Sequence, residues 1–358
     1  MRPTGWKNTA SSGKRGSTGW KTTCTRCRHR SKRSVDLNVP ELPSANEFLC
    51  TRLVAAPRDL VFRAWTEPDL LKGWWDDPAK FTLETCEADL RPGGAYRRIM
   101  RGANGKVFIQ QGVYETLDAP ALLAYSESCD EEGAEPFTWR VVVTFDEYFG
   151  KTLVSIRAIF DDVPDAGWRA AWMQGQREVF ARLAASYAGT SDTAAREFEL
   201  IREFNAPPEL VFDAWTQPEH MAQWWGPNGF TSPDCRMDAQ PGGAFRIVMR
   251  APDGQDFPFK GHFLEVHRPY RLVYTNDCTE HGDEFADAID PARDKSRPLP
   301  PVLSITEVSF ESHNNRTRMS VRMTFEQVKY LEGSQRVGMS QGWQESFDKL
   351  AGILPAAD

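Results

Sequence analysis

The sequence predicts an α+β protein with two copies of one domain, each an antiparallel sheet of about seven strands curled around a long C-terminal helix. The stretch 55–75, AAPRDLVFRAWTEPDLLKGWW, recurs as 205–225, NAPPELVFDAWTQPEHMAQWW, with more than half of the positions identical. The same series of strand-like segments and one long helical segment follows each copy. A match of this length and order is typical of a tandem repeat.

The predicted organisation is a basic tail (1–45), a first domain (46–188), a polar linker (189–196) and a second domain (197–358). Residues 1–34 contain ten Lys or Arg and no acid, with few aliphatic side chains, so we expect the tail to be disordered. Cys24, Cys27 and His29 lack the second ligand pair of a zinc site. An alternative is that the natural start lies near Val35.

Charge and composition narrow the function classes. The net charge is −7 although the tail is basic, so the folded part is acidic and is a poor candidate for binding nucleic acid. No apolar run reaches the ~18 residues of a membrane span, and no signal-peptide pattern follows Met1. Seven cysteines without a dense framework fit a reducing compartment. We therefore expect a soluble, cytoplasmic protein.

Each copy of the repeated stretch predicts two short helices joined end to end. Pro57 and Pro207 lie near the start of the first helix, where proline is favoured. Apolar residues recur at helical spacing through both segments, and each copy ends in two tryptophans. Thr66 and Thr216 precede a proline and an acid in capping-box order, so we expect them to cap the second helix.

The remaining segments alternate as strands or repeat as helices. In the first domain we expect strands at 48–54, 81–89, 95–101, 107–116, 122–128, 138–145 and 152–160, and a helix at 166–187. In the second we expect strands at 198–204, 231–238, 244–249, 257–266, 271–276, 302–311 and 317–325, and a helix at 333–353. The second domain is longer between Glu280 and Pro301, which we interpret as a neutral surface insertion; the alternative is a loop that covers a pocket mouth.

The order A-P-x-x-L-V-F-x-A-W-T-x-P, then W-W, then P-G-G-A-[YF]-R, resembles the family of activator of heat-shock protein 90 ATPase homologues. This family belongs to the SRPBCC (START-like) superfamily. The second domain also has the family's W-W-G-P-x-x-F region at Trp224–Phe230, whereas the first departs from it after Trp75. The resemblance implies a helix-grip fold with a cavity for apolar small molecules. It also implies a possible chaperone partner, as for the eukaryotic namesake.

A bent sheet that grips one helix tends to leave an interior cavity, and aromatic side chains would line it. Trp75 and Trp225, where the helix pair meets the sheet, are our preferred candidates. The full set of predicted cavity residues is Trp75, Tyr96, Met100, Tyr125, Trp172, Phe180, Trp225, Phe245, Met249, His262, Tyr274, Trp343 and Phe347.

The sequence offers little catalytic chemistry. The histidines and the paired cysteines Cys86/Cys235 and Cys129/Cys278 are not spaced as metal ligands, and no phosphate loop, dinucleotide fingerprint or nucleophile elbow is present. We predict no metal, no cofactor and no assigned catalytic residue. His262 could face the second cavity and move a proton there. Glu265 and its repeat partner Glu115 are interpreted as exposed acids of the sheet face.

Three functions remain open. The preferred one is non-catalytic binding of a hydrophobic or aromatic small molecule in one or both cavities. The first alternative is a cyclase, dehydratase or hydrolase that acts on an aromatic or polyketide-like substrate through His262 or a cavity tyrosine. The second is a co-chaperone-like activator of a heat-shock ATPase.

Overall fold

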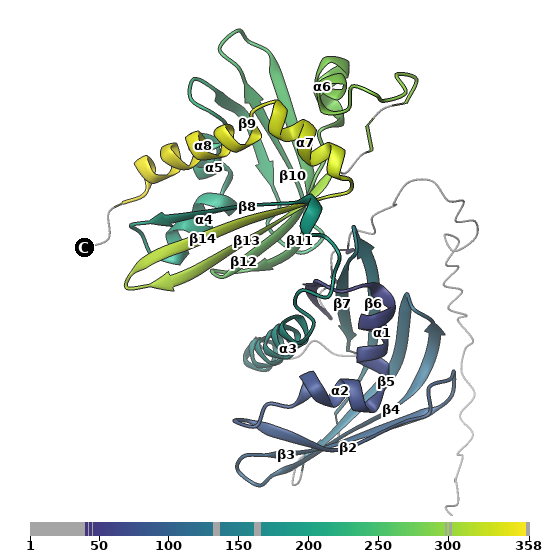
Figure 1. Ribbon diagram of the computed structural model, residues 1–358. Helices are drawn as coiled ribbons and strands as arrows, with labels where there is room; N and C mark the ends of the chain where they lie inside the picture. Colours follow the sequence, from purple (N-terminus) through teal and green to yellow (C-terminus); the bar gives the residue numbers. More distant parts are fainter. Residues whose placement is uncertain are drawn as a thin grey trace, which may run out of the picture. The chain divides into compact units, whose positions relative to one another are not determined.

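The structure is a computed structural model that describes residues 40–41, 43–44, 46–131, 137–160, 166–297, 299–300 and 303–355. Within these ranges the chain forms two seven-stranded antiparallel sheets, each accompanied by helices (Figure 1). The predicted fold class, two tandem α+β helix-grip domains, is confirmed. Most of the predicted tail lies outside the described residues. Among the described residues, no helix has both the length and the apolarity that crossing a membrane requires.

The first repeat has the strand order β1-β7-β6-β5-β4-β3-β2. Its strands are β1 (Glu47–Val54), β2 (Phe81–Ala88), β3 (Ala95–Gly102), β4 (Val107–Asp118), β5 (Leu122–Glu131), β6 (Phe137–Tyr148) and β7 (Lys151–Ile159). Its helices are α1 (Arg58–Thr66), α2 (Pro68–Trp75) and α3 (Ala166–Ser186). Each predicted strand is present, with ends shifted by a few residues.

The second repeat has the equivalent order β8-β14-β13-β12-β11-β10-β9. Its strands are β8 (Glu197–Phe204), β9 (Thr231–Met237), β10 (Ala244–Arg250), β11 (Asp256–His267), β12 (Arg271–Asn276), β13 (Ser304–His313) and β14 (Arg316–Phe325). Its helices are α4 (Pro208–Thr216), α5 (Pro218–Trp224), α6 (Gly282–Ile289), α7 (Val328–Arg336) and α8 (Met339–Ile353). Two short 3₁₀ turns, η1 (Ala194–Arg196) and η2 (Thr279–His281), complete the list.

A tryptophan replaces a missing backbone donor in each helix pair. The Ala214 carbonyl would accept an α-helical bond from residue 218, but Pro218 has no N–H. The Trp224 indole Nε1 donates to this carbonyl instead, at 2.9 Å. In the first repeat, Trp74 Nε1 donates to the Ala64 carbonyl at the same distance. The first tryptophan of each WW pair therefore fixes the angle between the two helices.

The predicted capping by threonine is wrong. α2 begins at Pro68 with Glu67 at the N-cap position, and no side chain caps it. Thr66 Oγ1 donates to the Phe62 carbonyl one turn earlier in α1, and Thr216 does the same to Phe212 in α4. The threonine hydroxyl bonds back to its own helix because the chain is still helical at that residue.

Each sheet bends at a glycine that contacts the next strand. A Cβ atom at Gly112 of β4 would lie 1.8 Å from the Ser126 carbonyl oxygen, and one at Gly261 of β11 would lie 2.0 Å from that of Thr275. The ring of Tyr96 or Phe245 covers the vacant side, with its nearest carbon 2.8 Å from the same Cβ position. The strands can approach this closely only because these residues have no side chain.

The terminal helix differs between the repeats. α3 is continuous, whereas the single helix predicted at 333–353 is broken into α7 and α8 (Figure 1). The break lies at Gly338, whose φ of 90° is left-handed and ends α-helical geometry. Phe180 in α3 and Phe347 in α8 are both fully buried, so both helices still fill the concave side of their sheets.

The insertion between Glu280 and Pro301 is part of the core, so its interpretation as a neutral surface loop is wrong. It forms η2 and α6, and its Ile289 is fully buried within the core of the second repeat. Gly333 of α7 packs directly on Ile289: an added Cβ would lie 2.1 Å from the Ile289 carbonyl oxygen. This close contact attaches the insertion to the helix that begins the C-terminal segment.

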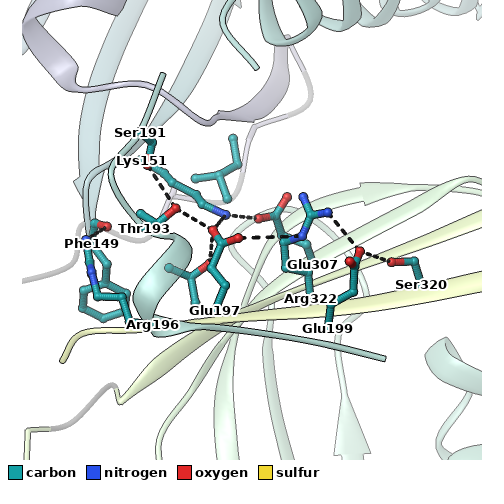
Figure 2. Close-up of polar contacts among 12 residues, drawn as sticks. Phe149, Lys151, Ser191, Thr193, Arg196, Glu197, Glu199, Glu307, Ser320 and Arg322 are labelled. Atoms are coloured by element: carbon teal, nitrogen blue, oxygen red, sulfur yellow. Dashed lines mark hydrogen bonds and ion pairs between the residues drawn. The ribbon is translucent and has the colours of Figure 1, made fainter. Parts of the chain in front are cut away.

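Charged side chains connect strands of the two repeats. Lys151 Nζ of β7 lies 2.9 Å from Glu197 Oε1 and 2.7 Å from Glu307 Oε1 (Figure 2). Arg271 of β12 pairs with Glu307 at 2.6 Å and with Glu265 at 3.0 Å. Each carboxylate in this group therefore has a nearby cation, as buried charges require.

Glu265 is fully buried, so its assignment as an exposed acid is wrong. The Leu53 N–H of β1 donates to its carboxylate at 2.5 Å, and the surrounding apolar cluster combines residues of both repeats, including Leu153 and Leu264. Glu115, which we expected to be its repeat partner, is exposed and pairs with Arg140; the strand registers instead match Glu265 with Thr116, and Glu115 with the buried Leu264. The two acids therefore do not occupy equivalent positions, and of the two only Glu265 is covered by a strand from the other repeat.

The glycine bends give the first testable prediction. Gly112→Ala forces a Cβ into a backbone carbonyl and should lower the free energy of unfolding by more than about 2 kcal/mol. Gly73→Ala is the matched control: it lies exposed in α2 with no atom within 4 Å of the added Cβ. It should be neutral or stabilising by up to about 1 kcal/mol. Chemical denaturation measures both, and equal effects of the two variants would contradict the bend.

Glu307 predicts acid sensitivity. Burial opposes its ionisation, but the Arg271 and Lys151 charges outweigh burial and lower its pKa to about 2. Because the folded-state pKa is depressed, this stabilisation is complete above about pH 4.5 and is lost as the pH falls toward 2. Between about pH 4.5 and pH 2, the free energy of unfolding of Glu307→Gln should therefore fall by up to about 3 kcal/mol less than that of wild type.

Glu311→Gln on the same strand is the control, because the Glu311 side chain is largely exposed. Unfolding curves measured across pH 2–6 should therefore differ from wild type for Glu307→Gln and match it for Glu311→Gln. Parallel acid profiles for Glu307→Gln and wild type would show that the Glu307 carboxylate is not the group responsible.

Candidate functional site

The concave side of each sheet, closed by the helix pair and the C-terminal helix, forms a cup. The second cup encloses a cavity of about 10 Å³. The residues that line it come from both helices of the pair, from the position just after α5, and from four strands; they are Trp215, Met221, Trp225, Met237, Phe245, Ile247, Phe263 and Tyr274. This volume is close to the minimum that holds one water molecule, and is much smaller than the roomy interior expected from the sequence.

Three buried polar atoms at the second cup lack partners, namely Trp215 Nε1, Trp225 Nε1 and the Tyr274 hydroxyl. Trp225 Nε1 and the Tyr274 hydroxyl are both inaccessible to solvent and make no hydrogen bond. Thr306, the cross-strand neighbour of Tyr274, accepts a hydrogen bond from Asn276 Nδ2 at 2.6 Å and makes none with the Tyr274 hydroxyl. Burial raises the pKa of Tyr274, so its hydroxyl remains a donor at neutral pH. Unpaired buried donors of this kind require an explanation, such as a bound acceptor.

The tryptophan equivalent to Trp225 does have a hydrogen-bond partner in the first repeat. Trp75 Nε1 donates to the Met100 sulfur at 3.4 Å. Trp65 Nε1 in the first repeat and the equivalent Trp215 Nε1 in the second both lack a hydrogen-bond partner. An unpaired indole N–H at this position is therefore shared by the two repeats. The free donor of Trp225 is therefore specific to the second cup.

Aromatic rings of the last helix close the second cup. Trp343 of α8 stacks on Trp215, with ring centroids 5.9 Å apart and planes 20° apart, and meets Trp225 edge-on at 5.2 Å. Phe347 packs against Trp343 and Trp224. Met221, Met237 and the half-buried Met249 add flexible thioether side chains to this group.

The first cup contains charged groups. Arg98 of β3 is 4 % exposed and Glu127 of β5 is 7 % exposed. Arg98 Nη1 lies 3.9 Å from Glu127 Oε2, and the Tyr96 hydroxyl donates to the same oxygen at 2.8 Å. The guanidinium carbon lies 4.7 Å from the ring centroid of Trp75 and 4.9 Å from that of Tyr96. The cation is thus held between two aromatic faces.

Most predicted cavity residues lie inside the cups. In the first repeat Tyr96, Met100 and Tyr125 face the core together with Trp75, whereas Phe180 packs on Trp65 and Trp172 packs on Phe48 of β1. In the second repeat Trp225, Phe245, Tyr274, Trp343 and Phe347 belong to one core cluster, with Met249 at its border.

His262 does not face the second cup, so its prediction is wrong. Its neighbours Gly261 and Phe263 are buried, and His262 between them is exposed on the other face of the sheet. Sequence reasoning also missed several residues that matter here, namely Arg98, Gln110 and Glu127 in the first cup and Trp215, Met221, Met237 and Phe263 in the second. Strict alternation from Tyr96 or Phe245 along the strands would have found most of them.

A hollow of about 530 Å³ on the first repeat is not the predicted cavity. It is open to solvent and is lined chiefly by residues such as Ala95, Val113 and Ser126, which pair across β3, β4 and β5. These residues alternate with the buried Tyr96 and Tyr114, so their side chains lie on the convex face of the first sheet. Nowhere in the described part of the chain do three His, Cys, Asp or Glu side chains form a cluster suited to a metal ion.

The two tryptophans of the second WW pair predict a stability difference. Trp224→Phe leaves the Ala214 carbonyl without a donor, whereas Trp225→Phe removes a donor that has no partner. Both variants lose similar ring volume, so Trp224→Phe should be less stable than Trp225→Phe by about 1–3 kcal/mol. Thermal or chemical unfolding of the two variants measures the difference; a more damaging Trp225→Phe would mean that its indole N–H is paired.

Several solved structures are similar to parts of this chain or to most of it. No curated protein matches the chain. Similar solved structures include a protein from Nitrosomonas europaea (28 % identity, 44 % of this chain and 94 % of that chain, TM-score 0.37) and one from Arthrobacter aurescens (24 %, 47 % and 93 %, 0.37). Another is the di-domain ARO/CYC StfQ from the steffimycin biosynthetic pathway (14 %, 86 % and 97 %, 0.33).

The family comparison gives the clearest result. The model of the family described as "Activator of Hsp90 ATPase homolog 1-like protein" matches residues 55–188 and again residues 205–355. Each match begins just before a helix pair and extends through the C-terminal helix of that repeat. The chain therefore belongs to the Activator of Hsp90 ATPase homolog 1-like protein family, with two copies of the family's domain.

Proposed function

We propose that the second cup binds an apolar, planar small molecule that carries a hydrogen-bond acceptor such as a carbonyl oxygen. The observation that supports this most directly is the pair of buried, unpartnered donors, Trp225 Nε1 and the Tyr274 hydroxyl, at the wall of one aromatic cavity. Leaving such a donor unpaired costs about 1–3 kcal/mol, and an acceptor on a ligand would recover that free energy.

Binding requires the cup to expand. A cavity of about 10 Å³ has room for a water molecule but not for an aromatic ring. Met221 and Met237 line the cavity, and unbranched methionine side chains change rotamer more readily than aromatic rings do. We expect these side chains to move outward while Trp215, Trp225 and Tyr274 stay in place, so that an aromatic ligand replaces thioether contacts with ring contacts.

The composition of this cup favours binding over catalysis. Its lining is aromatic, aliphatic or thioether, and its one titratable group, Tyr274, keeps its proton because burial raises its pKa. General acid–base catalysis needs a group with a pKa near the working pH. The enzyme alternative that relied on His262 loses its support, since His262 is exposed on the opposite face. The co-chaperone alternative rests on the family description alone.

A matched ligand pair tests the proposal on the full chain. 2-Acetylnaphthalene carries a carbonyl acceptor, and 2-ethylnaphthalene has nearly the same shape without one. With ¹⁵N-labelled tryptophan, the Trp225 indole resonance should shift with both, and the acetyl compound should bind up to about tenfold more tightly. Trp225→Phe and Tyr274→Phe should each reduce this preference, while Trp75→Phe in the first repeat should leave it unchanged.

The failure of the proposal would be clear in the same titration. If neither compound shifts the Trp225 indole resonance up to its solubility limit, a single water molecule is the better explanation of the unpaired donors. Equal affinity for the two compounds would show that the donors do not recognise an acceptor.

A further inference from the structure

The walls of the two cups carry different chemistry at equivalent positions. The matching register of the strands around Gly112 and Gly261 aligns the two sets. The first cup has Tyr96, Arg98, Gln110, Tyr114 and Glu127 where the second has Phe245, Ile247, Phe259, Phe263 and Asn276. Every one of these exchanges makes the wall of the first cup more polar or charged than that of the second.

The second cup serves as an internal control for the fold. It forms the same sheet, bend and helix pair with apolar residues at four of these positions. The fold therefore does not need a guanidinium and a carboxylate inside the cup. Burying such a pair is costly, and replacing it with apolar residues is often neutral or stabilising. This cost indicates a role other than folding for Arg98 and Glu127.

The Arg98 guanidinium makes no close hydrogen bond to Glu127. The separation of 3.9 Å from Glu127 Oε2 is well beyond the ~2.8 Å of a charge-assisted hydrogen bond. Trp75 and Tyr96 contact the guanidinium through their ring faces, so these two contacts do not use its in-plane N–H groups as hydrogen-bond donors. A guanidinium in this setting suits a planar carboxylate.

We propose that the first cup binds an aromatic carboxylic acid, with its carboxylate on Arg98, its ring among Trp75 and the cup tyrosines, and a proton taken up by Glu127. The proton is required because two carboxylates cannot both be ionised beside one guanidinium without strong repulsion. Tyr96 already donates to Glu127 Oε2, and the other carboxylate oxygen can hold the added proton.

The groups that surround Glu127 support this coupling. Burial raises the pKa of Glu127, and Arg98 and Tyr96 offset only part of that effect. The other titratable groups facing the pair are Tyr114 of β4, Tyr125 of β5 and Cys86 of β2. Burial raises the pKa of all three, so they remain neutral near pH 7 and Glu127 is the group that takes up the proton.

This site is independent of the one proposed for the second cup. The first cup offers the positively charged Arg98 to an anion. The second cup offers uncharged donors to a neutral acceptor. Aromatic ligands should therefore divide between the repeats by charge: an aromatic acid binds in the first cup and a neutral aromatic ketone in the second.

Isothermal titration of the full chain with 2-naphthoate and with uncharged 2-naphthalenemethanol tests the inference. We expect 2-naphthoate to bind at least about tenfold more tightly than the alcohol. Its binding heat should vary with buffer ionisation enthalpy in the way that uptake of one proton requires. Above the pKa of Glu127, its affinity should fall about tenfold per pH unit. Glu127→Gln should abolish this pH dependence and keep the binding.

Arg98→Ile, which introduces the residue of the second cup, should weaken 2-naphthoate binding at least about tenfold, while Arg98→Lys should restore part of it. Arg97→Ile is the matched control, because Arg97 is the exposed neighbour on the convex face. The double variant Arg98→Ile/Glu127→Asn reports on folding: its midpoint of thermal unfolding should equal or exceed that of wild type.

Three results would overturn the inference. The first is no 2-naphthoate binding by wild type at millimolar concentration. The second is unchanged affinity in Arg98→Ile. The third is a double variant that unfolds well below wild type while wild type binds the acid and the alcohol equally, which would make the ion pair a structural element of the first repeat.

Discussion

The whole architecture depends on one close approach, that of a glycine in the fourth strand of each sheet to the carbonyl of the neighbouring strand. Gly112 and Gly261 have no room for a β-carbon, and this lets each sheet turn sharply enough to enclose its C-terminal helix. The vacant side of the glycine is covered by an aromatic ring, Tyr96 or Phe245. The bend therefore creates the cup and also places the first aromatic residue of its wall.

The helix pair completes the cup by a second local constraint. Pro68 and Pro218 remove a backbone donor, and Trp74 and Trp224 supply it from their side chains. These tryptophans are committed to the backbone, so Trp75 and Trp225 are left to face the interior. In the first repeat the interior indole finds a methionine sulfur, and in the second it finds no partner. One duplicated motif thus yields a structural tryptophan and one that is available for recognition.

Much of the fold could be predicted from the sequence because it is set locally. The repeat, the strand alternation and the two helices of each pair depend on neighbouring residues, and they are present as expected. Features that depend on distant contacts could not be predicted. Glu265 is buried by β1 of the other repeat, and the insertion around Ile289 joins the core because Gly333 lets α7 approach it. The sequence near a charged residue or a polar loop does not indicate which distant residues will pack against it.

The candidate site was predictable in part. The preferred tryptophans, Trp75 and Trp225, lie in the cups. The alternation of Phe259, Gly261 and Phe263 along the strand places His262 on the outer face, so this pattern should have excluded His262 from the cavity. The divergence of the cups could also have been seen by aligning the repeats, since Arg98 and Ile247 occupy the same strand position. Whether the walls enclose empty space depends on side-chain packing, which no sequence pattern specifies.

The most direct test of the central claim, that these cups are ligand-binding interiors, is a crystal structure of the full chain soaked with 2-acetylnaphthalene. We expect density for the compound in the second cup, with its carbonyl oxygen about 3 Å from Trp225 Nε1 or the Tyr274 hydroxyl and with Met221 or Met237 displaced. An unchanged cup holding a single ordered water between these donors would contradict it.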